Sequence, residues 1–357
     1  MSVVFFNSCK SWGGGEKWHY EMAVAMSKFD FDVIAAGNPN AVFLQKAEAS
    51  GLNTKKQSVF GLSFLNPLKL LKLRNYFKKQ HVDTIIMNMS ADLKLAGIAA
   101  KMAGVKNIIY RRGSAIPIKN KPLNRFLFRN ILTHVLANSE ETKRTILANN
   151  DRLFPKERIR VIYNGLDLNL FEHVSPKAEQ DQVILGNLAR LSKQKGQKYL
   201  IPLAKKLKDN GINFKLLIGG IGELEADLKQ EVAAKGLEKE IEFVGFVSDP
   251  KAFLEQLDIF VFPSIWEGFG FSIVEAKLCQ KPVVAFAMSS NPEVIVDGVD
   301  GFLVEPLNQE AFYEKTVQLI ADPVLRKEMG EKGRQDAIQR FSKEKCIQEV
   351  HNYLKSL

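Results

Sequence analysis

Two glutamates, Glu267 and Glu275, stand eight residues apart in the segment PSIWEGFGFSIVEAKLCQKPVVAF, residues 263–286. Gly268 and Gly270 allow the backbone to turn tightly and to expose amides at the start of a helical pattern, which is an anion site by geometry. The first glutamate lies in the loop and the second lies one turn into the helix, so both side chains can face the opening of the same binding site. The alternative interpretation is a helix start with one carboxylate favoured by the helix dipole and one surface glutamate.

Other patterns that suggest chemistry have simpler explanations. Gly220-Ile221-Gly222 opens a helical pattern as a dinucleotide fingerprint does, but the third glycine would fall at Glu225, so a nicotinamide site is not expected. Asp30-Phe31-Asp32 spells a metal-binding D-x-D pair, yet it lies where a helix passes into a strand and is interpreted as a turn. The histidines are isolated, with no pair at ligand spacing, at positions 19, 81, 134, 173 and 351. We expect no metal and no cofactor.

The elements that must position these residues form two passes of alternating strand and helix. Strand-like runs of the first pass cover 2–6, 31–37, 57–60, 83–89, 107–110, 134–139 and 160–165. Those of the second pass cover 183–189, 214–220, 241–246, 259–264 and 282–286. Helical patterns separate most of them, and the chain after Leu307 is almost entirely helical. Short apolar runs between helices indicate parallel strands buried on both faces, so the sequence predicts an α/β protein with two doubly wound, Rossmann-like domains.

Length and composition agree with this organisation. A chain of 357 residues suggests two domains, and 46% apolar with 25% charged residues is typical of a globular protein. The cysteines, Cys9, Cys279 and Cys346, are too few and too scattered for a disulfide framework, which favours a reducing compartment. No apolar run reaches the roughly 18 residues of a membrane span, and no signal peptide pattern is evident. We therefore expect a cytoplasmic protein.

The net charge of +10 is unevenly distributed. Residues 1–165 hold 26 Lys and Arg against 11 Asp and Glu, whereas the remainder holds 24 against 29. A surplus confined to one half suggests one domain that faces an anionic lipid surface, a phosphorylated acceptor or nucleic acid. Residues 55–79 mix Lys and Arg with Leu and Phe at helical spacing, and residues 119–129 repeat the mixture. Such basic amphipathic stretches suit an anionic membrane interface, although a core-facing helix with a solvated basic face would look the same.

Several segments together resemble one enzyme family. The E-x7-E pattern in its EGFG…VEA context resembles the signature of the retaining glycosyltransferases of the group 1, or family 4, kind, which have the GT-B fold. The further similar segments, in family order, are GGGE (13–16), VIYNGLD (161–167), NLARLSKQKG (187–196), FVGFVSDP (243–250) and SSNPEVIVDGVDGFLVEP (289–306).

This resemblance implies roles for particular residues. Arg190 and Lys195 would hold the donor diphosphate without a metal and, with Glu267 on the sugar hydroxyls, form the catalytic set. Glu275 would bind the ribose diol. The remaining donor-binding residues implied are Gly14, Gly15, Phe246, Gly268, Phe269 and Gly270.

The chain departs from the family on the acceptor side. Many relatives carry a histidine after the strand that here ends in Tyr110, and this chain has Arg111-Arg112-Gly113-Ser114 instead. Arg111, Arg112 and His19 are the candidate acceptor-side residues, with Arg112 suited to an anionic acceptor or the leaving phosphate.

The resemblance also implies a domain division, a reaction and a location for the protein. Residues 1–165 would form the acceptor domain and 166–335 the nucleotide-sugar domain, with a C-terminal helix, 336–357, packing back on the first. It would transfer a sugar with retention from a nucleotide-diphosphate sugar to a hydroxyl of a glycan or glycolipid, in lipopolysaccharide, capsule or glycolipid synthesis. It would lie in the cytoplasm or on the inner face of the membrane, with no nucleic-acid partner. The alternatives left open are a nucleotide-sugar epimerase on the same fold and a non-catalytic nucleotide-sugar-binding subunit.

Overall fold

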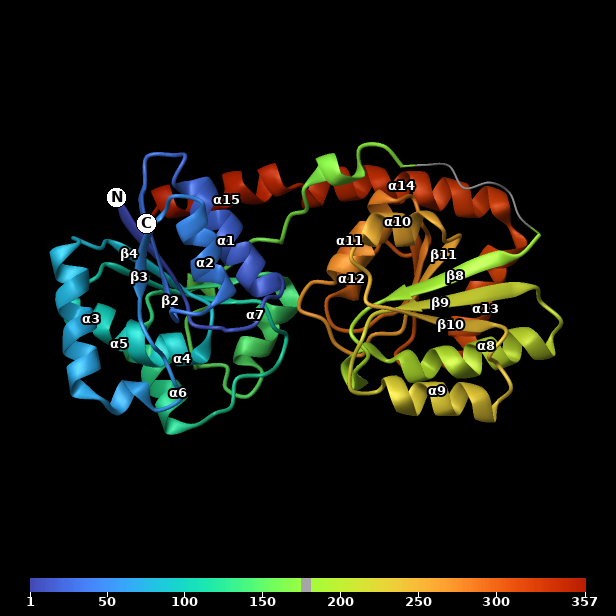
Figure 1. Ribbon diagram of the computed structural model, residues 1–357, viewed down its shortest axis with the longest axis horizontal. Coiled ribbons are helices and arrows are strands. Elements are labelled where there is room, and N and C mark those ends of the chain that lie inside the picture. Colours follow the sequence, from blue (N-terminus) through green and yellow to red (C-terminus); the bar gives the residue numbers. More distant parts are fainter. Residues whose placement is uncertain (175–180) are drawn as a thin grey trace. The chain divides into compact units, whose positions relative to one another are not determined.

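In the computed structural model, which describes residues 1–174 and 181–357, the chain divides into two units with separate cores (Figure 1). Unit 1 consists of Met1–Asn164 and Cys346–Leu357, and unit 2 of Gly165–Lys345. The end of the chain thus belongs to the same unit as its beginning. Unit 2 continues past residue 335, where the sequence pattern places its end.

Unit 1 is built on a seven-stranded parallel sheet of order β3-β2-β1-β4-β5-β6-β7. The strands are β1 (Ser2–Asn7), β2 (Asp32–Gly37), β3 (Asn53–Lys56), β4 (Thr84–Met87), β5 (Asn107–Arg112), β6 (His134–Ala137) and β7 (Ile159–Val161). The order reverses between β1 and β4, as in a doubly wound domain. The expected strand at 57–60 is wrong, because the edge strand is the polar, half-exposed β3. Val59 is instead a core residue beyond it, with its amide bonded to Asn38.

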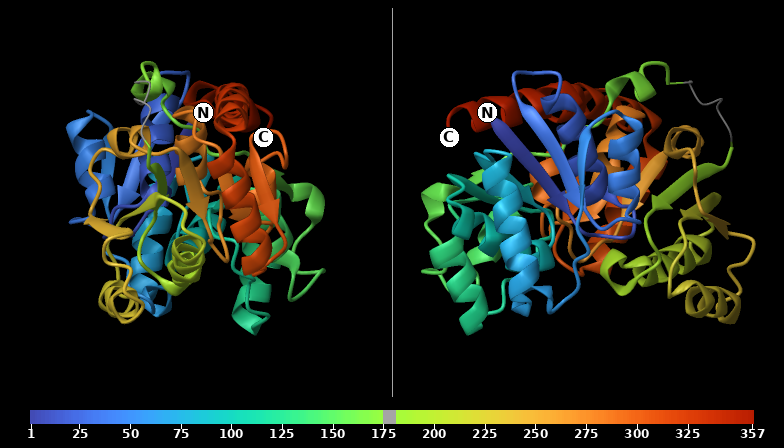
Figure 2. Two further views of the ribbon diagram at one scale, coloured as in Figure 1. Left: turned by 90° about the vertical axis from the view of Figure 1, so that its right-hand side faces the viewer. Right: turned by 60° about the vertical axis from the view of Figure 1, so that its left-hand side comes forward.

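Successive residues of the central strands point into two different cores. Val3 and Phe5 enter the cluster formed with one set of helices, whereas Val4 and Phe6 enter the cluster on the other face. The helices of the first face are α1 (Gly14–Met26), α2 (Val42–Ala49) and the Cys346–Leu357 part of α15 (Lys343–Lys355). Both views of Figure 2 show the red C-terminal residues beside the blue N-terminal elements.

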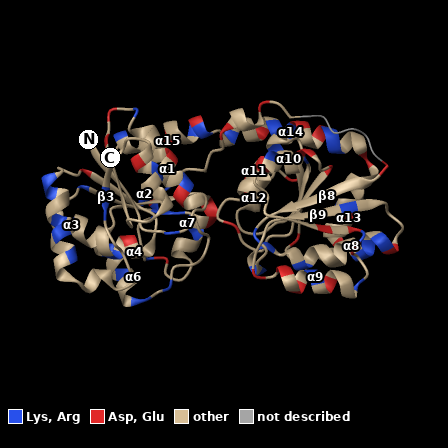
Figure 3. Ribbon diagram, in the orientation of Figure 1, with Lys and Arg blue, Asp and Glu red and all other residues tan. Residues whose placement is uncertain are grey.

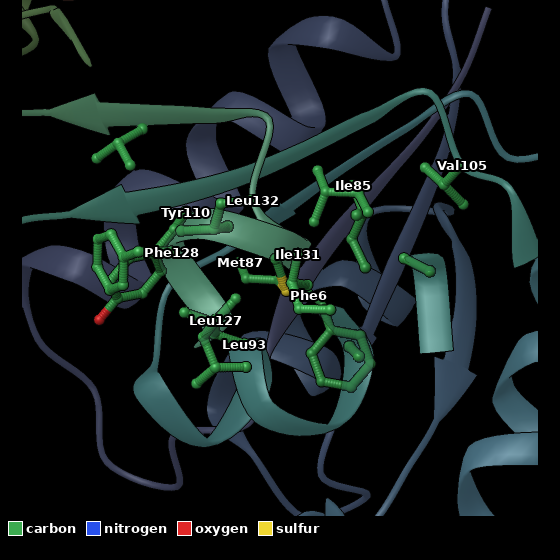
Figure 4. Close-up of a cluster of buried hydrophobic side chains, with 14 of the residues drawn as sticks. Phe6, Ile85, Met87, Leu93, Val105, Tyr110, Leu127, Phe128, Ile131 and Leu132 are labelled. Atoms are coloured by element: carbon green, nitrogen blue, oxygen red, sulfur yellow. The ribbon is translucent and has the colours of Figure 1, made fainter. Parts of the chain in front are cut away.

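The second face of this sheet is covered by the remaining helices of unit 1. They are α3 (Pro67–Lys79), α4 (Ser90–Asp92), η2 (Leu93–Gly97), α5 (Ile98–Ala103), α6 (Pro122–Phe126), η3 (Leu127–Ile131) and α7 (Glu140–Leu147). Figure 4 shows Phe6, Met87 and Tyr110 of the strands packed with Leu93 and Phe128 of these helices. Burial on both faces confirms the interpretation of the apolar runs as central parallel strands.

Unit 2 repeats the plan with a six-stranded parallel sheet of order β10-β9-β8-β11-β12-β13. The strands are β8 (Val183–Leu188), β9 (Phe214–Gly219), β10 (Ile241–Gly245), β11 (Ile259–Phe262), β12 (Val283–Phe286) and β13 (Gly301–Val304). One face packs on α8 (Leu200–Asp209), α9 (Glu225–Ala234) and α13 (Gln309–Ala321). The other is covered by α10 (Pro250–Glu255), α11 (Phe271–Leu278) and α14 (Pro323–Phe341), as Figure 1 shows.

The topology predicts where ligands bind. In open parallel sheets, ligands occupy the crevice outside the carboxyl ends of the strands where the strand order reverses. In unit 1 that place is beside the ends of β1 and β4, and in unit 2 beside the ends of β8 and β11. No helix within residues 1–174 and 181–357 is long and apolar enough to cross a membrane.

Candidate active site

Glu267 lies in the loop after β11 and is held by two donors on one oxygen. The Lys195 Nζ is 2.5 Å from Glu267 Oε1, and the Ser264 Oγ donates to the same oxygen at 2.7 Å. Only 7% of the Glu267 side chain and 18% of the Lys195 side chain are exposed. Because both protein donors use Oε1, the other carboxylate oxygen is left to accept a hydrogen bond from a ligand hydroxyl.

Gly196 explains how Lys195 reaches this position. Its φ is +67°, and a Cβ there would lie 2.0 Å from the carbonyl oxygen of Pro263 at the end of β11. Only glycine therefore lets the loop after β8 pack so closely on the end of β11. The contact continues where the amide of Ile265 donates to the Gln194 carbonyl at 2.8 Å. The K-G pair of the sequence thus positions the lysine through its glycine.

A third loop holds the backbone of Glu267. The Glu267 amide donates to Ser289 Oγ at 3.1 Å, and the Ser289 hydroxyl donates back to the Glu267 carbonyl at 2.7 Å. Ser290 donates to the same carbonyl at 3.2 Å. Sequence reasoning missed Ser264, Ser289 and Ser290 as site residues. Their position directly after β11 and β12, at the carboxyl edge of the sheet, was the available signal.

Arg190 lies on the same loop as Lys195 and borders a hollow. A cavity of about 310 Å³ is lined by Arg190, Leu191, Ser192, Lys193, Gln194, Glu223 and Trp266. Arg190 is exposed, and Trp266 is 40% exposed. The cavity therefore combines cations, suited to phosphate oxygens, with an aromatic face.

The glycine turn before α11 has the expected geometry. Gly270 is the residue before the helix and has φ +83°, a left-handed conformation that favours glycine. Glu275 is half-buried in the middle of α11. Phe269 is only 2% exposed and packs edge-on against Phe271 and Phe341, so its side chain is a core group and only its backbone can reach a donor.

Phe246, unlike Phe269, has an exposed side chain. It follows β10 directly, and 74% of it is exposed. An exposed aromatic ring at the carboxyl edge of the sheet is free to stack on a planar ligand group.

Unit 1 places a buried cation at its own carboxyl edge. Arg111 is 3% exposed, and its guanidinium donates to Asn164 Oδ1 at 2.8 Å and to Asn88 Oδ1 at 3.4 Å. It lies over the ring of Trp18, 4.4 Å from the centroid. Burial lowers the pKa of Arg111 to about 10, so the group stays charged at neutral pH. Its hydrogen-bond partners are neutral amides, and the nearby Glu16 charge acts on its pKa in the direction opposite to burial.

The glycine-rich loop meets this cation. A Cβ at Gly15 would lie 3.0 Å from Asn88 Nδ2 and 3.6 Å from the Arg111 guanidinium, whereas Gly14 begins α1. Asn88 in turn donates to Glu16 Oε1 at 3.1 Å. Sequence reasoning missed Asn88, Asn164 and the role of Glu16, because their juxtaposition depends on the strand order.

One acceptor-side expectation is corrected, and another stays a prediction. His19 is fully buried among aromatic rings, with its Nε2 3.2 Å from the Ile86 carbonyl. Burial and the nearby Arg111 charge lower its pKa to about 3, so it is a neutral core residue that cannot meet an acceptor. Arg112 is half-buried, and its guanidinium bonds the carbonyl of Ile116 in its own loop. Arg112 stays a candidate for the acceptor side.

Within the part of the chain that the structure describes, no group of three or more His, Cys, Asp or Glu residues could hold a metal ion. Asp30 is exposed in the turn before β2, where the sequence analysis placed a turn.

Two Rossmann-like units, each with polar groups at the carboxyl edge of its sheet, define the GT-B class of glycosyltransferases. The chain belongs to the group 1, or family 4, glycosyltransferases. Residues 170–336 match the family described as Glycosyl transferases group 1, and residues 12–170 match Glycosyltransferase Family 4. An uncharacterized glycosyltransferase of Methanocaldococcus jannaschii is 30% identical over 83% of this chain and 82% of its own length.

Relatives with a named activity match over less of their length. The poly(ribitol-phosphate) alpha-N-acetylglucosaminyltransferase of Staphylococcus aureus is 31% identical over 57% of this chain, which covers 41% of that protein. The capsular polysaccharide biosynthesis glycosyltransferase CapM of S. aureus is 30% identical over 62% of this chain and 60% of its own length.

Solved structures agree with the fold. Anabaena HepE in complex with UDP matches with a TM-score of 0.86 at 23% identity, over 100% of both chains. The lipopolysaccharide outer core galactosyltransferase WaaB in its apo form matches with a TM-score of 0.81 at 19% identity, over 100% of this chain and 99% of that one. These matches confirm the predicted GT-B fold.

Proposed function

We propose that this glycosyltransferase moves a sugar, with retention of anomeric configuration, from a nucleoside-diphosphate sugar to a hydroxyl of a glycan or glycolipid. The bond from the anomeric carbon to the diphosphate oxygen breaks, and a bond to the acceptor oxygen forms. The acceptor proton leaves with the diphosphate or to water. The observation that carries the proposal is the buried Lys195–Glu267 pair beside Arg190 at the carboxyl edge of unit 2.

The two charges of this pair suit different parts of a donor. The Lys195 ammonium and the Arg190 guanidinium attract the diphosphate, whose negative charge grows as the sugar departs. Glu267 keeps one carboxylate oxygen for a sugar hydroxyl, because both protein donors bind Oε1. Glu275 on α11 is the proposed partner of the ribose diol, and Phe246 is the proposed stacking partner of the base. Cations in these positions can stabilise the leaving group, so we propose that no metal ion is required.

Arg111 is the proposed anion contact of unit 1. A buried guanidinium without a direct carboxylate partner is costly unless a ligand supplies negative charge. The Arg111 guanidinium donates its hydrogen bonds to the side-chain amides of Asn88 and Asn164. A phosphate of the donor or of the acceptor supplies that charge.

The named relatives guide the proposed acceptor class. They include enzymes of capsular polysaccharide and poly(ribitol-phosphate) synthesis and an Escherichia coli galactosyltransferase acting on a diphosphoundecaprenol-linked sugar. A polysaccharide or lipid-linked glycan of this kind would fit the positive charge of the first half of the chain.

We also propose that unit 1 binds an anionic membrane surface peripherally. Leu73 and Phe77 of α3 are buried in the core, as a core-facing helix requires. A second apolar set around the start of α3 points outward instead: Phe60 at 60%, Leu62 at 71%, Leu65 at 65% and Leu68 at 73% exposure. Lysines and an arginine lie along the same helix (Figure 3). Exposed leucines beside cations are suited to the boundary between lipid tails and anionic headgroups.

A panel of UDP-, GDP- and ADP-sugars tests the donor class by thermal shift of the whole protein. The best donor is then incubated with the protein alone. A transferase gives only slow hydrolysis under these conditions, whereas an epimerase gives a changed sugar. Binding of no nucleotide sugar, or rapid release of an epimer, would overturn the proposal.

A further inference from the structure

The hydroxyl of Ser289 makes two hydrogen bonds to the backbone of Glu267. It accepts a hydrogen bond from the Glu267 amide at 3.1 Å and donates one to the Glu267 carbonyl at 2.7 Å. A hydroxyl can do both at once. The residue comes from the loop after β12, so this pair of bonds ties two loops of the sheet edge together at the proposed sugar-binding glutamate.

The backbone of Ser289 is in a conformation that favours glycine. Its φ is +53°, and it is one of four non-glycine residues with positive φ that are recorded in the described ranges, with His81, Gln280 and Leu307. A serine here is disfavoured relative to glycine, which has no Cβ to clash. Strain of this kind persists where surrounding structure requires it and is concentrated at functional sites. A glycine at position 289 would avoid this strain but would lack the hydroxyl that bonds Glu267.

The loop after β12 is also held by contacts that do not involve the Ser289 hydroxyl. Asn291 Nδ2 donates to the Phe286 carbonyl at 3.0 Å, and the Asn291 amide donates to the Met288 carbonyl at 3.1 Å. Ser290 and Asn291 are both fully buried. These contacts fix the course of the loop, so the two bonds from Ser289 serve the position of Glu267.

Hydrogen bonds hold Glu267 both at its backbone and at its carboxylate. Ser289 fixes the residue at its amide and carbonyl, while Ser264 and Lys195 fix Oε1 at 2.7 and 2.5 Å. Without the Ser289 hydroxyl the Glu267 amide loses its partner and the carbonyl keeps only its bond from Ser290, so the peptide can rotate and the second carboxylate oxygen moves with it. Reacting groups displaced by about 1 Å can lose roughly 10²-fold in rate.

We infer that Ser289 is a positioning residue that sets the Glu267 carboxylate against the donor sugar, an inference that rests on the proposed function. Both hydrogen bonds of its hydroxyl go to the backbone of Glu267, so it acts through that residue. The hydroxyl therefore affects the sugar end of the donor alone, and its loss separates nucleotide binding from turnover.

The test is Ser289→Gly in the whole protein, with UDP and the best-binding sugar nucleotide of the panel as probes. Glycine relieves the backbone strain and removes the hydroxyl. We expect an unchanged or higher Tm, UDP affinity within about twofold of wild type, and kcat lowered roughly 10- to 100-fold. Ser289→Ala should show the same loss of kcat with no gain in Tm, because it keeps the Cβ.

Gln280→Gly is the matched control. Gln280 has φ +57° and is exposed at the end of α11, so glycine relieves a similar strain away from Glu267. We expect a Tm change like that of Ser289→Gly and normal kcat. Near-normal kcat in both serine variants, or an equal loss of affinity for UDP and for the sugar nucleotide, would overturn the inference. If the wild-type protein itself binds no sugar nucleotide or transfers no sugar, the proposed function fails instead, and the inference falls with it.

Discussion

At the residue scale, Lys195 and Glu267 depend on each other. Each is mostly buried, and their charged atoms are 2.5 Å apart. Removing one partner leaves the other as an uncompensated charge in a poorly solvated place. Effects of substitutions at the two positions will therefore not add.

Replacement of Lys195 or Arg190 by Ala should slow turnover more than it weakens donor binding, because negative charge on the diphosphate grows during departure. We expect a loss of kcat on the order of 10²-fold for each, by analogy with the loss of one oxyanion donor. Steady-state kinetics with a saturating acceptor measure this. Lys198→Ala, which removes an exposed cation of the following segment that does not line the cavity, is the control. Near-normal rates in both main variants would show that the donor diphosphate binds elsewhere.

The roles of Glu267 and Glu275 can be distinguished by comparing the binding of UDP with that of the sugar nucleotide. Glu275→Gln should weaken the binding of UDP and of the sugar nucleotide alike, if Glu275 holds the ribose. Glu267→Gln should leave UDP affinity intact or slightly increased while transfer collapses, because it loses only sugar contacts and frees Lys195. A hydrogen bond to a charged group contributes roughly 1.5–3 kcal/mol, lost only for the ligand part it reaches. Calorimetric titration measures both ligands, and equal losses for both in both variants would indicate a purely structural pair.

At the element scale, the junction of β4 and α4 buries a carboxyl group. Asp92 is fully buried, and its Oδ2 accepts from the amides of Met89 at 3.0 Å and Ser8 at 3.3 Å. It ties the ends of β4 and β1 together at the point where the strand order reverses. Burial raises the pKa of Asp92 to about 7, and burial lowers that of His19, on α1, to about 3.

These two pKa shifts have opposite effects on stability between about pH 4 and 6.5. There the folded state holds a proton on Asp92 that the unfolded state lacks, so stability falls as pH rises. The unfolded state holds a proton on His19 that the folded state lacks, so stability rises with pH. Asp92→Asn removes the first effect. We expect the unfolding free energy of this variant to rise by about 1.4 kcal/mol per pH unit up to pH 6.5, relative to a flatter wild type.

Denaturant unfolding at several pH values measures this difference. Parallel pH profiles for wild type and Asp92→Asn would contradict the raised pKa of Asp92. Asp30→Asn is the matched control, because Asp30 is exposed and its replacement should leave the profile unchanged.

The helix α3 and the segment before it carry the proposed membrane contact. Combined Leu62→Ser, Leu65→Ser and Leu68→Ser should weaken binding to vesicles that contain anionic lipid, since the inserted apolar surface is lost. Wild-type binding should fall steeply with salt and be absent from neutral vesicles. Leu170→Ser with Val324→Ser, which removes comparably exposed apolar side chains of unit 2, is the control. Equal sedimentation of wild type with neutral and anionic vesicles would contradict the proposal.

At the scale of the whole molecule, each unit holds cations near the place where its strand order reverses. Arg111 lies there in unit 1, and Arg190 and Lys195 lie there in unit 2. In unit 2, the two cations of one loop can serve as the counter-charge of a leaving diphosphate in place of a metal ion.

Turnover should accordingly survive chelation. We expect the rate of transfer in excess EDTA to stay within about twofold of the untreated rate, because fixed cations stabilise the departing charge. The measurement compares initial rates before EDTA, after EDTA, and after manganese is added back. Activity that disappears with EDTA and returns with manganese would refute metal independence.

The sequence alone was sufficient to predict the fold class and most elements. Apolar runs of four to six residues between amphipathic helices are a local pattern, and strands buried on both faces produce it directly. The edge strand β3 escaped prediction because it buries little and its polar residues carry no such pattern. The spacing of Glu267 and Glu275 likewise singled them out, and the resemblance to the family pointed to Arg190 and Lys195.

Only the tertiary structure decided which side chains meet. Lys195 and Glu267 are far apart in the chain, and strand order with the close approach allowed by Gly196 brings them to 2.5 Å. The same applies to Ser289, whose neighbour across the sheet edge no local pattern reveals. His19 was misjudged for the converse reason. Its place on α1 is a local property, but whether it faces solvent or the aromatic core depends on the packing of that helix against the sheet.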